Sequence, residues 1–378
     1  MPLDIISKDN LFDLEGKLRV LESEPEGAEA TIRLARQTSG DFFCESRIAT
    51  IIATCARRFA LITRDWHNLW EPHLLQEHFG ASLAGLTAAL YSRQLTNIVH
   101  VQFPQSSTEL LERITTAGGI LEPKESRGSS ITFCAFDPDW TEPAALSGTV
   151  TNRPLFKRTF AAYRTKYLEI GTGLQHTAET READNDLADF VFELYQNTFE
   201  HGRLDAHDRP IPGMRYVRLR KHIGVNKASL VSRAGEWPEL KAYLEWVIPN
   251  GKEFKLYEIT VSDQGLGMIG RLTAKRPDLV RPLASVEERT ALLNEMLLHP
   301  VTSKRDFPGT GYGLSRTLRA ISRLQGFVSL RTDRSWLYGS SAIDEELEKT
   351  GLKPVPGATD LPKVTGTLFN ILLPMRMN

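Results

Sequence analysis

The sequence predicts an α/β protein in which a smaller N-terminal α/β domain precedes a larger one. The chain has 378 residues, more than one hydrophobic core usually requires. Apolar residues at helical spacing alternate along it with short apolar runs that are typical of strands. Residues 137–154 are rich in Pro, Gly and Thr, which puts the expected boundary there and gives domains 1–145 and 146–378.

The composition excludes several classes of protein. Hydrophobic residues make up 41% of the chain and charged residues 25%, which is ordinary for a globular protein and argues against disorder, collagen or coiled coil. The 46 Lys and Arg residues nearly balance the 47 Asp and Glu residues, so no overall charge attracts nucleic acid or a membrane. There is no apolar run of about 18 residues, and the N-terminus carries acids where a signal peptide needs bases. The three cysteines form no CxxC pair, so we expect a cytoplasmic protein without disulfides.

The secondary structure of both domains is expected to be mixed. In the N-terminal domain, helices are expected at about 48–55, 71–93 and 107–117, and strands at 59–63, 97–103 and 131–136. This domain is assigned no more than a sensing or partner-binding role. In the C-terminal domain, helices are expected at about 157–171, 184–201, 237–247, 285–298 and 314–324, and strands at 214–220, 253–263 and 367–374. Residues 221–252 form an insertion, and Ser285 with Glu288 matches a capping box.

The first motif is a polar triplet, Glu193, Asn197 and His201, within an expected helix. Four-residue spacing puts these side chains along one helix face, at the edge of an apolar stripe. A carboxylate one turn from a carboxamide suits a general base beside a magnesium ligand. The alternative is a helix with a solvated polar edge.

The second motif follows an apolar strand and contains Asp263, Gly265 and Gly267. The two glycines let the backbone turn sharply and approach a flat ligand. A carboxylate at the strand end can accept a hydrogen bond from an exocyclic amine such as that of adenine. An ordinary Asp–Gly turn is the alternative.

The third motif is a glycine-rich segment that opens an amphipathic helix. Its residues are Gly309, Thr310, Gly311, Tyr312, Gly313 and Leu314. Bare backbone amides at a helix N-terminus form an anion site, so phosphates fit here, although a purely structural turn is the alternative. The segment is not a Rossmann fingerprint, because no strand precedes it, and it lacks the lysine of a Walker loop.

In this order, the three motifs resemble the N, G1 and G2 boxes of the GHKL ATPase superfamily, which includes DNA gyrase, large heat-shock chaperones, histidine kinases and mismatch-repair ATPases. Residues 366–374 are similar to the closing strand of that domain. The resemblance covers about residues 155–378 and implies a Bergerat-type α/β sandwich, in which helices cover a mixed sheet. The insertion at 221–252 exceeds what a compact histidine-kinase domain needs.

The resemblance also implies roles for single residues. Asn197 would hold Mg²⁺, and Glu193 would be the catalytic base that activates water. Asp263 would accept a hydrogen bond from the adenine amino group. Gly265 and Gly267 would close the pocket, and Thr367 would contact the adenine through a water molecule. His201 matches a position that is often basic and faces phosphate, or it is a surface histidine.

The glycine-rich segment would wrap the phosphates at the hinge of a lid formed by about residues 299–312. Lys304 lies just before the glycines and is similar to the lid lysine of mismatch-repair ATPases, which would reach the γ-phosphate. A solvated lysine is the alternative.

We therefore expect Mg²⁺-dependent binding and hydrolysis of ATP, acting as a conformational switch for the N-terminal domain, a protein partner or a homodimer. A serine-type protein kinase of the same superfamily and a low-turnover nucleotide-binding module are the alternatives. A histidine kinase is disfavoured, because His176 is the only nearby acceptor and lacks the usual context. The basic stretch 209–233 raises nucleic acid as a partner but is more typical of a solvated strand edge. Transition-metal sites at His67 with His73, or near His201, lack ligand spacing.

Overall fold

The fold is known from a computed structural model. It describes residues 2–5, 8–25, 29–34, 41–58, 61–64, 83, 87, 99–100, 120–121, 130–137, 142–168, 178–224, 226–250, 254–276, 285–299, 313–344, 346–359 and 361–374. The α/β class expected from the sequence is confirmed in these residues.

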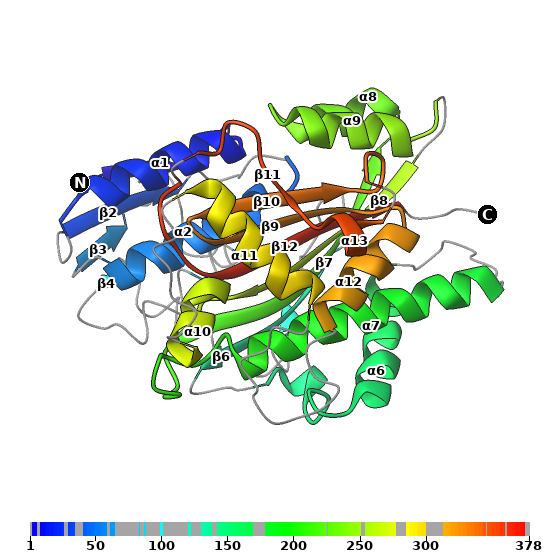
Figure 1. The fold of residues 1–378 in the computed structure, drawn as a ribbon, viewed down its shortest axis with the longest axis horizontal. Coiled ribbons are helices and arrows are strands. Elements are labelled where there is room, and N and C mark those ends of the chain that lie inside the picture. Colours follow the sequence, from blue (N-terminus) through cyan, green and yellow to red (C-terminus); the bar gives the residue numbers. More distant parts are fainter. Residues whose placement is uncertain are drawn as a thin grey trace, which may run out of the picture.

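An eight-stranded sheet forms the centre of the molecule, in the order β11-β10-β9-β12-β8-β7-β6-β5 (Figure 1). Its strands are β5 (Ile120–Leu121), β6 (Ser130–Asp137), β7 (Gly213–Gly224), β8 (Phe254–Asp263), β9 (Phe327–Asp333), β10 (Ser335–Ser340), β11 (Lys353–Pro354) and β12 (Val364–Pro374). The sequence predicted a mixed sheet, which is wrong for the described strands, because every neighbouring pair is antiparallel.

One face of this sheet is apolar and is covered by helices. In β8 the alternate residues Tyr257, Ile259 and Val261 belong to this core, as the period of two in a strand requires. The covering helices are α6 (Arg153–Leu168), α7 (Ala178–Glu200), α10 (Gly267–Lys275), α11 (Val286–Leu298) and α12 (Gly313–Arg323), with the short α13 (Leu347–Thr350) beside them. The capping box predicted for Ser285 and Glu288 is confirmed at the start of α11.

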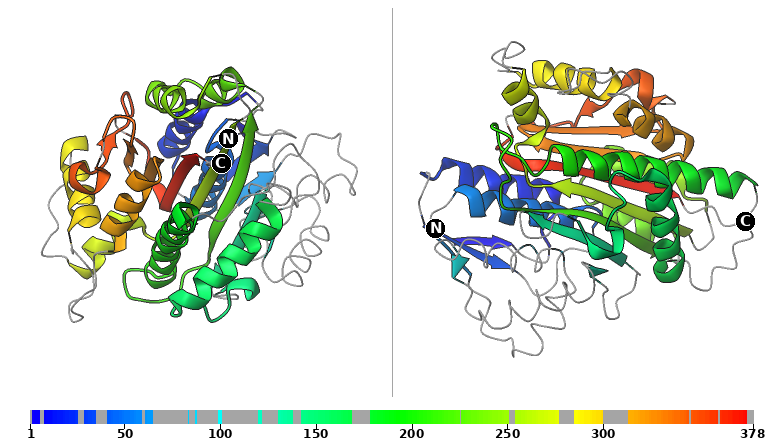
Figure 2. Two further views of the ribbon diagram at one scale, coloured as in Figure 1. Left: turned by 90° about the vertical axis from the view of Figure 1, so that its right-hand side faces the viewer. Right: turned by 90° about the horizontal axis from the view of Figure 1, so that it is seen from below.

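The opposite face of the sheet is polar along β8, where Glu258, Thr260 and Ser262 alternate with the apolar residues. All three are nevertheless buried, at 3% exposure or less. The helix α2 (Cys44–Arg58) and its neighbour α1 (Leu11–Ser23) are on this side, so helices lie on both faces of the sheet (Figure 2). The face of helix α2 that packs on the sheet therefore needs polar side chains as well as apolar ones.

Three consecutive polar residues of α2 make these contacts. The Glu45 carboxylate lies 2.6 Å from the Arg218 guanidinium of β7, and the Ser46 hydroxyl donates to the Asn370 side-chain oxygen of β12 at 2.9 Å. Arg47 forms an ion pair with Glu15 of α1, whose carboxylate also lies 2.9 Å from Arg331 of β9. Because buried charges require partners, these pairs explain why polar residues occupy a buried helix.

A second sheet of four parallel strands lies beyond α1 and α2. Its strands, in order, are β1 (Pro2–Ile5), β2 (Glu29–Leu34), β3 (Leu61–Arg64) and β4 (Val99–His100). Helix α2 contacts both β3 of this sheet and β12 of the large one. The two helices thus connect the small parallel sheet to the large antiparallel sheet.

The segments on either side of the boundary expected at residues 145–146 share one sheet and one core. Strand β6 lies before it, yet β6 pairs with β7 along its whole length, from Ser130 opposite Arg220 to Asp137 opposite Gly213. Helices α1 and α2 also lie before it and share a hydrophobic cluster with β9, β10 and β12. The Pro- and Gly-rich stretch forms the 3₁₀ turn η1 (Ala144–Leu146), which leads into α6. Turn composition marks a change of direction here and not a separation of cores.

The insertion at 221–252 is part of the same core. After β7 ends, the chain forms α8 (Lys227–Val231), the 3₁₀ turn η2 (Ser232–Ala234) and the predicted helix α9 (Pro238–Val247). The buried Trp237 ring lies 5.2 Å from the Phe327 ring and 5.0 Å from the Trp336 ring, centroid to centroid. The insertion therefore covers the sheet face next to α1, a role that the sequence did not suggest.

Two expected helices, 71–93 and 107–117, lie outside the described residues apart from residues 83 and 87, which are helical. The expected strands at 59–63 and 97–103 correspond to β3 and β4. Within the described ranges, none of the helices has the length and apolar character needed to cross a bilayer.

Candidate functional site

Helix α7 carries the first predicted motif. It begins earlier than expected, at Ala178, and ends at Glu200. Glu193 and Asn197 are half-buried on it, one turn apart. His201 follows directly, and its backbone N–H donates to the Asn197 carbonyl at 2.9 Å, so the helical spacing continues through the motif. Among the described residues, no hydrogen bond is formed by the Asn197 side chain, which leaves its oxygen available to a cation.

The Glu193 carboxylate lies between two other helices. Its Oε1 forms an ion pair with Arg153 at the start of α6, and the Arg153 guanidinium also lies 5.0 Å from the centre of the Phe192 ring. Its Oε2 lies against Gly313 at the start of α12, where an added Cβ atom would collide with it. A larger residue at this position would require the carboxylate to move. The first and third motifs thus touch at their nearest described residues.

Asp263 ends β8 and is buried, with 7% of its surface exposed. The backbone N–H of Gly265 donates to its Oδ1 at 2.9 Å, and Thr367 lies opposite it in the ladder with β12. Burial raises the pKa of this carboxyl from 3.8 to about 6, and the opposing effects of the Gly265 and Thr367 amides and of the Arg215 and Arg57 charges are smaller. The second motif and the predicted Thr367 are therefore adjacent.

Three backbone segments pack closely around Asp263, and each contributes a glycine to the contact. A Cβ atom on Gly202, just after α7, would collide with the Asp263 side chain, and one on Gly265 would collide with the Gly202 carbonyl. Gly366 has φ +78° and faces the Asp263 carbonyl, so no other residue fits without strain. These glycines hold the end of α7, the end of β8 and the start of β12 together.

Thr332 at the end of β9 also contacts the residues around Asp263, and nothing in the sequence indicated this role. Its hydroxyl accepts a hydrogen bond from the Met268 backbone at 3.0 Å and donates to the Gly366 carbonyl at 3.1 Å. It also lies 3.4 Å from the Thr367 hydroxyl. A threonine at a strand end has no local signature, so only the fold reveals that it links the Gly267 turn to β12.

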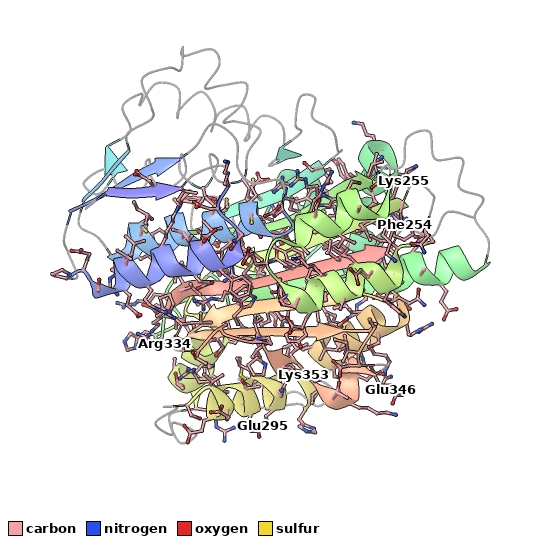
Figure 3. The ribbon with its side chains drawn as sticks, turned by 90° about the horizontal axis from the view of Figure 1, so that it is seen from above. Phe254, Lys255, Glu295, Arg334, Glu346 and Lys353 are labelled. Carbon is pink, nitrogen blue, oxygen red and sulfur yellow. The ribbon has the colours of Figure 1, made fainter. Side chains whose placement is uncertain are left out.

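The structure brings Asp263, Gly265, Gly267 and Thr367 to one end of the large sheet. Helix α7 links these residues to Gly313 at the start of α12. Glu193 on the helix touches Gly313, and Gly202 just after the helix touches Asp263. In Figure 3 this end of the sheet is marked by Arg334, which follows β9, while Phe254 and Lys255 at the start of β8 mark the other end.

The remaining predicted residues are less informative. Leu314 is half-buried and packs against the core, so its described role is structural. The His201 ring is half-buried, with Nε2 4.0 Å from the Glu200 carboxylate. Lys304 and residues 309–312, the rest of the glycine-rich motif and its lid, lie outside the described residues.

Several basic side chains of the stretch 209–233 make contacts inside the protein. Arg215 pairs with Asp137 at 2.6 Å, Arg218 pairs with Glu45 at 2.6 Å, and the Lys221 ammonium donates to the Leu168 carbonyl at 2.6 Å. All three basic side chains are buried. Their charges serve internal contacts, so they do not form a polyanion-binding surface. In the part of the chain that is described, no cluster of three His, Cys, Asp or Glu residues suits a metal ion.

Comparison of the chain with protein-family profiles, with curated proteins and with solved structures gives no match.

Proposed function

We propose that the protein binds ATP with Mg²⁺ and hydrolyses it in a GHKL-type domain of Bergerat architecture, as a nucleotide-driven conformational switch. The observation that carries this proposal is the position of α7. Glu193 on this helix touches Gly313 of the glycine-rich motif, and Gly202 just after it touches Asp263. The described parts of three motifs that are far apart in the sequence therefore lie beside one helix, which supports a shared site.

Each group has a definite task in this proposal. The Asp263 carboxylate accepts a hydrogen bond from the amino group of adenine, and its burial strengthens that bond. Asn197 would hold Mg²⁺, which would supply positive charge next to the phosphates. The glycine-rich motif offers backbone amides to the phosphates. Glu193 takes the proton of the attacking water, since Oε2 faces the start of α12.

Ligand binding by the purified chain tests the proposal directly. At about 100 times the dissociation constant, ATP or ADP with Mg²⁺ should stabilise the fold by about 2.7 kcal/mol and raise the melting temperature by about 3 °C. GTP should not, because its base presents a carbonyl where adenine has an amine. In Asn197→Ala the effect of Mg²⁺ on the ATP shift should disappear. Gln196→Ala is the control. Gln196 is the neighbour of Asn197 on α7, but its side chain is hydrogen-bonded to Glu200 at 3.1 Å. Equal shifts with ATP and GTP, or none with either, would contradict the proposal.

Arg153 should affect hydrolysis without affecting binding. Its guanidinium holds Oε1 of Glu193, which leaves Oε2 directed toward Gly313. We expect Arg153→Ala to lower kcat about tenfold through loss of orientation, with the ATP dissociation constant within about twofold of the native value. Steady-state phosphate release and calorimetry measure the two quantities.

The control for Arg153 is Lys157→Ala. Lys157 lies one turn further along α6 and pairs with Asp189 at 2.9 Å. The Lys157→Ala substitution should leave kcat unchanged. A higher rate in Arg153→Ala would mean that the ion pair withholds the base, as a low-turnover module would require, and would contradict the orienting role.

A further inference from the structure

The last turn of α2 reaches the candidate site from the N-terminal part of the chain. Arg57 donates from Nη1 to the Gly265 carbonyl at 3.3 Å and from Nη2 to the Pro212 carbonyl at 2.9 Å. Three residues earlier, the Thr54 hydroxyl accepts a hydrogen bond from the Thr365 backbone at 3.1 Å. Residues three apart share a helix face, so one turn of α2 holds both segments.

These two segments carry the groups assigned to the base of the nucleotide. Gly265 follows Asp263 by two residues and donates to its carboxylate. Thr365 precedes Thr367 by two residues, and Thr367 lies opposite Asp263 in the sheet. A shift of either segment would therefore move the Asp263 carboxylate relative to a bound base.

Helix α2 is itself fixed to the sheet at its other end. Glu45 pairs with Arg218, and Ser46 bonds to Asn370, which also accepts from Thr260 at 2.9 Å. These contacts are buried, whereas Arg57 is exposed. The helix is therefore a rigid support from which Arg57 and Thr54 extend to the site.

We propose that Arg57 and Thr54 are positioning residues for recognition of a 6-aminopurine nucleotide, so that the N-terminal segment completes the site. The inference rests on the proposed function. It also gives the small parallel sheet a route to the site, since β3 begins at Leu61, three residues after α2 ends at Arg58.

The experiment compares two neighbouring arginines in the full chain. Arg57→Met removes the contacts to Gly265 and Pro212. Arg58→Met is the matched control, because Arg58 bonds instead to the carbonyls of Glu22 and Glu24, at 2.9 Å for Glu24. Binding of ATP and GTP is measured by calorimetry. We expect Arg57→Met to weaken ATP binding about tenfold and to reduce the ratio of ATP affinity to GTP affinity. Arg57→Lys should restore part of the lost ATP affinity. Thr54→Val should weaken ATP about threefold, and Arg58→Met less than twofold.

A pH profile separates positioning from a general loss of structure. The charged groups that act on Asp263 are Arg57 from α2 and Arg215 from β7, alongside the amides of Gly265 and Thr367. Removing the Arg57 charge makes protonation of Asp263 easier, so the pH below which ATP affinity falls should move upward in Arg57→Met and stay in place in Arg58→Met.

The outcomes distinguish the two proposals. If the native chain does not bind ATP, the proposed function fails. If the native chain binds ATP and Arg57→Met matches Arg58→Met in affinity, preference and pH profile, this inference fails while the proposed function stands.

Discussion

Replacing Glu193 with glutamine is expected to lower the rate of ATP hydrolysis about a thousandfold and to leave ATP affinity within about threefold of the native value. Glutamine has the same shape and can still accept a hydrogen bond from Arg153, but it cannot take a proton from water. Glu193 lies against Gly313 and not against Asp263, so binding of the adenine ring should be unaffected. Phosphate release at saturating ATP gives the rate, and calorimetry gives the affinity.

Asp189→Asn is the matched control for this change. Asp189 lies one turn before Glu193 on α7 and is also close to Arg153, at 3.7 Å. Its carboxylate is paired with Lys157, so its loss should leave the rate unchanged. If Glu193→Gln hydrolyses ATP at the native rate, Glu193 is not the base. If label from ATP appears on protein in place of free phosphate, the serine-kinase alternative replaces the ATPase.

Replacing Asp263 with asparagine is expected to change binding and stability in opposite directions. ATP affinity should fall about a hundredfold or more, because the carboxylate that accepts the adenine amine is lost. The folded protein should become more stable at pH 8, by about 3 kcal/mol. Burial raises the pKa of Asp263 from 3.8 to about 6, so its ionised form is disfavoured in the folded state.

The sign of the pH dependence follows from the same shift. Because the folded state binds this proton more tightly than the unfolded state does, the contribution of Asp263 to stability falls as the pH rises from about 4 to about 6. Between pH 5 and pH 8 the native chain should lose about 1.4 kcal/mol that Asp263→Asn does not lose. Urea unfolding of both proteins at the two pH values measures the difference. A variant that is less stable at pH 8, or that keeps native ATP affinity, would contradict the assigned role of Asp263.

Much of the secondary structure could be predicted because its signals are local. Strands were expected at 131–136, 214–220, 253–263 and 367–374, and β6, β7, β8 and β12 confirm their positions within a few residues. The Ser285 and Glu288 capping box placed the start of α11 correctly. Helical spacing also put Glu193 and Asn197 on one face of α7, since that spacing depends only on helix geometry.

The roles of Arg153, Arg57 and Thr332 could not be predicted, because their partners are distant in the sequence. Arg153 meets Glu193 only when α6 packs against α7, and Arg57 meets Gly265 only when α2 lies on the sheet. An isolated arginine in a helix has no pattern that identifies such a partner.

The two faces of β8 separate what the sequence determined from what the tertiary structure decided. Alternation along the strand determined that Tyr257, Ile259 and Val261 share one face and that Glu258, Thr260 and Ser262 share the other. By itself this pattern would leave the polar face in water. Packing decided otherwise, because Glu258 pairs with His222 of β7 at 2.7 Å, and Thr260 donates to Asn370 of β12, which also accepts from Ser46 of α2. Side-chain direction is a property of the local backbone, whereas what covers a face depends on which distant segment has matching polar groups.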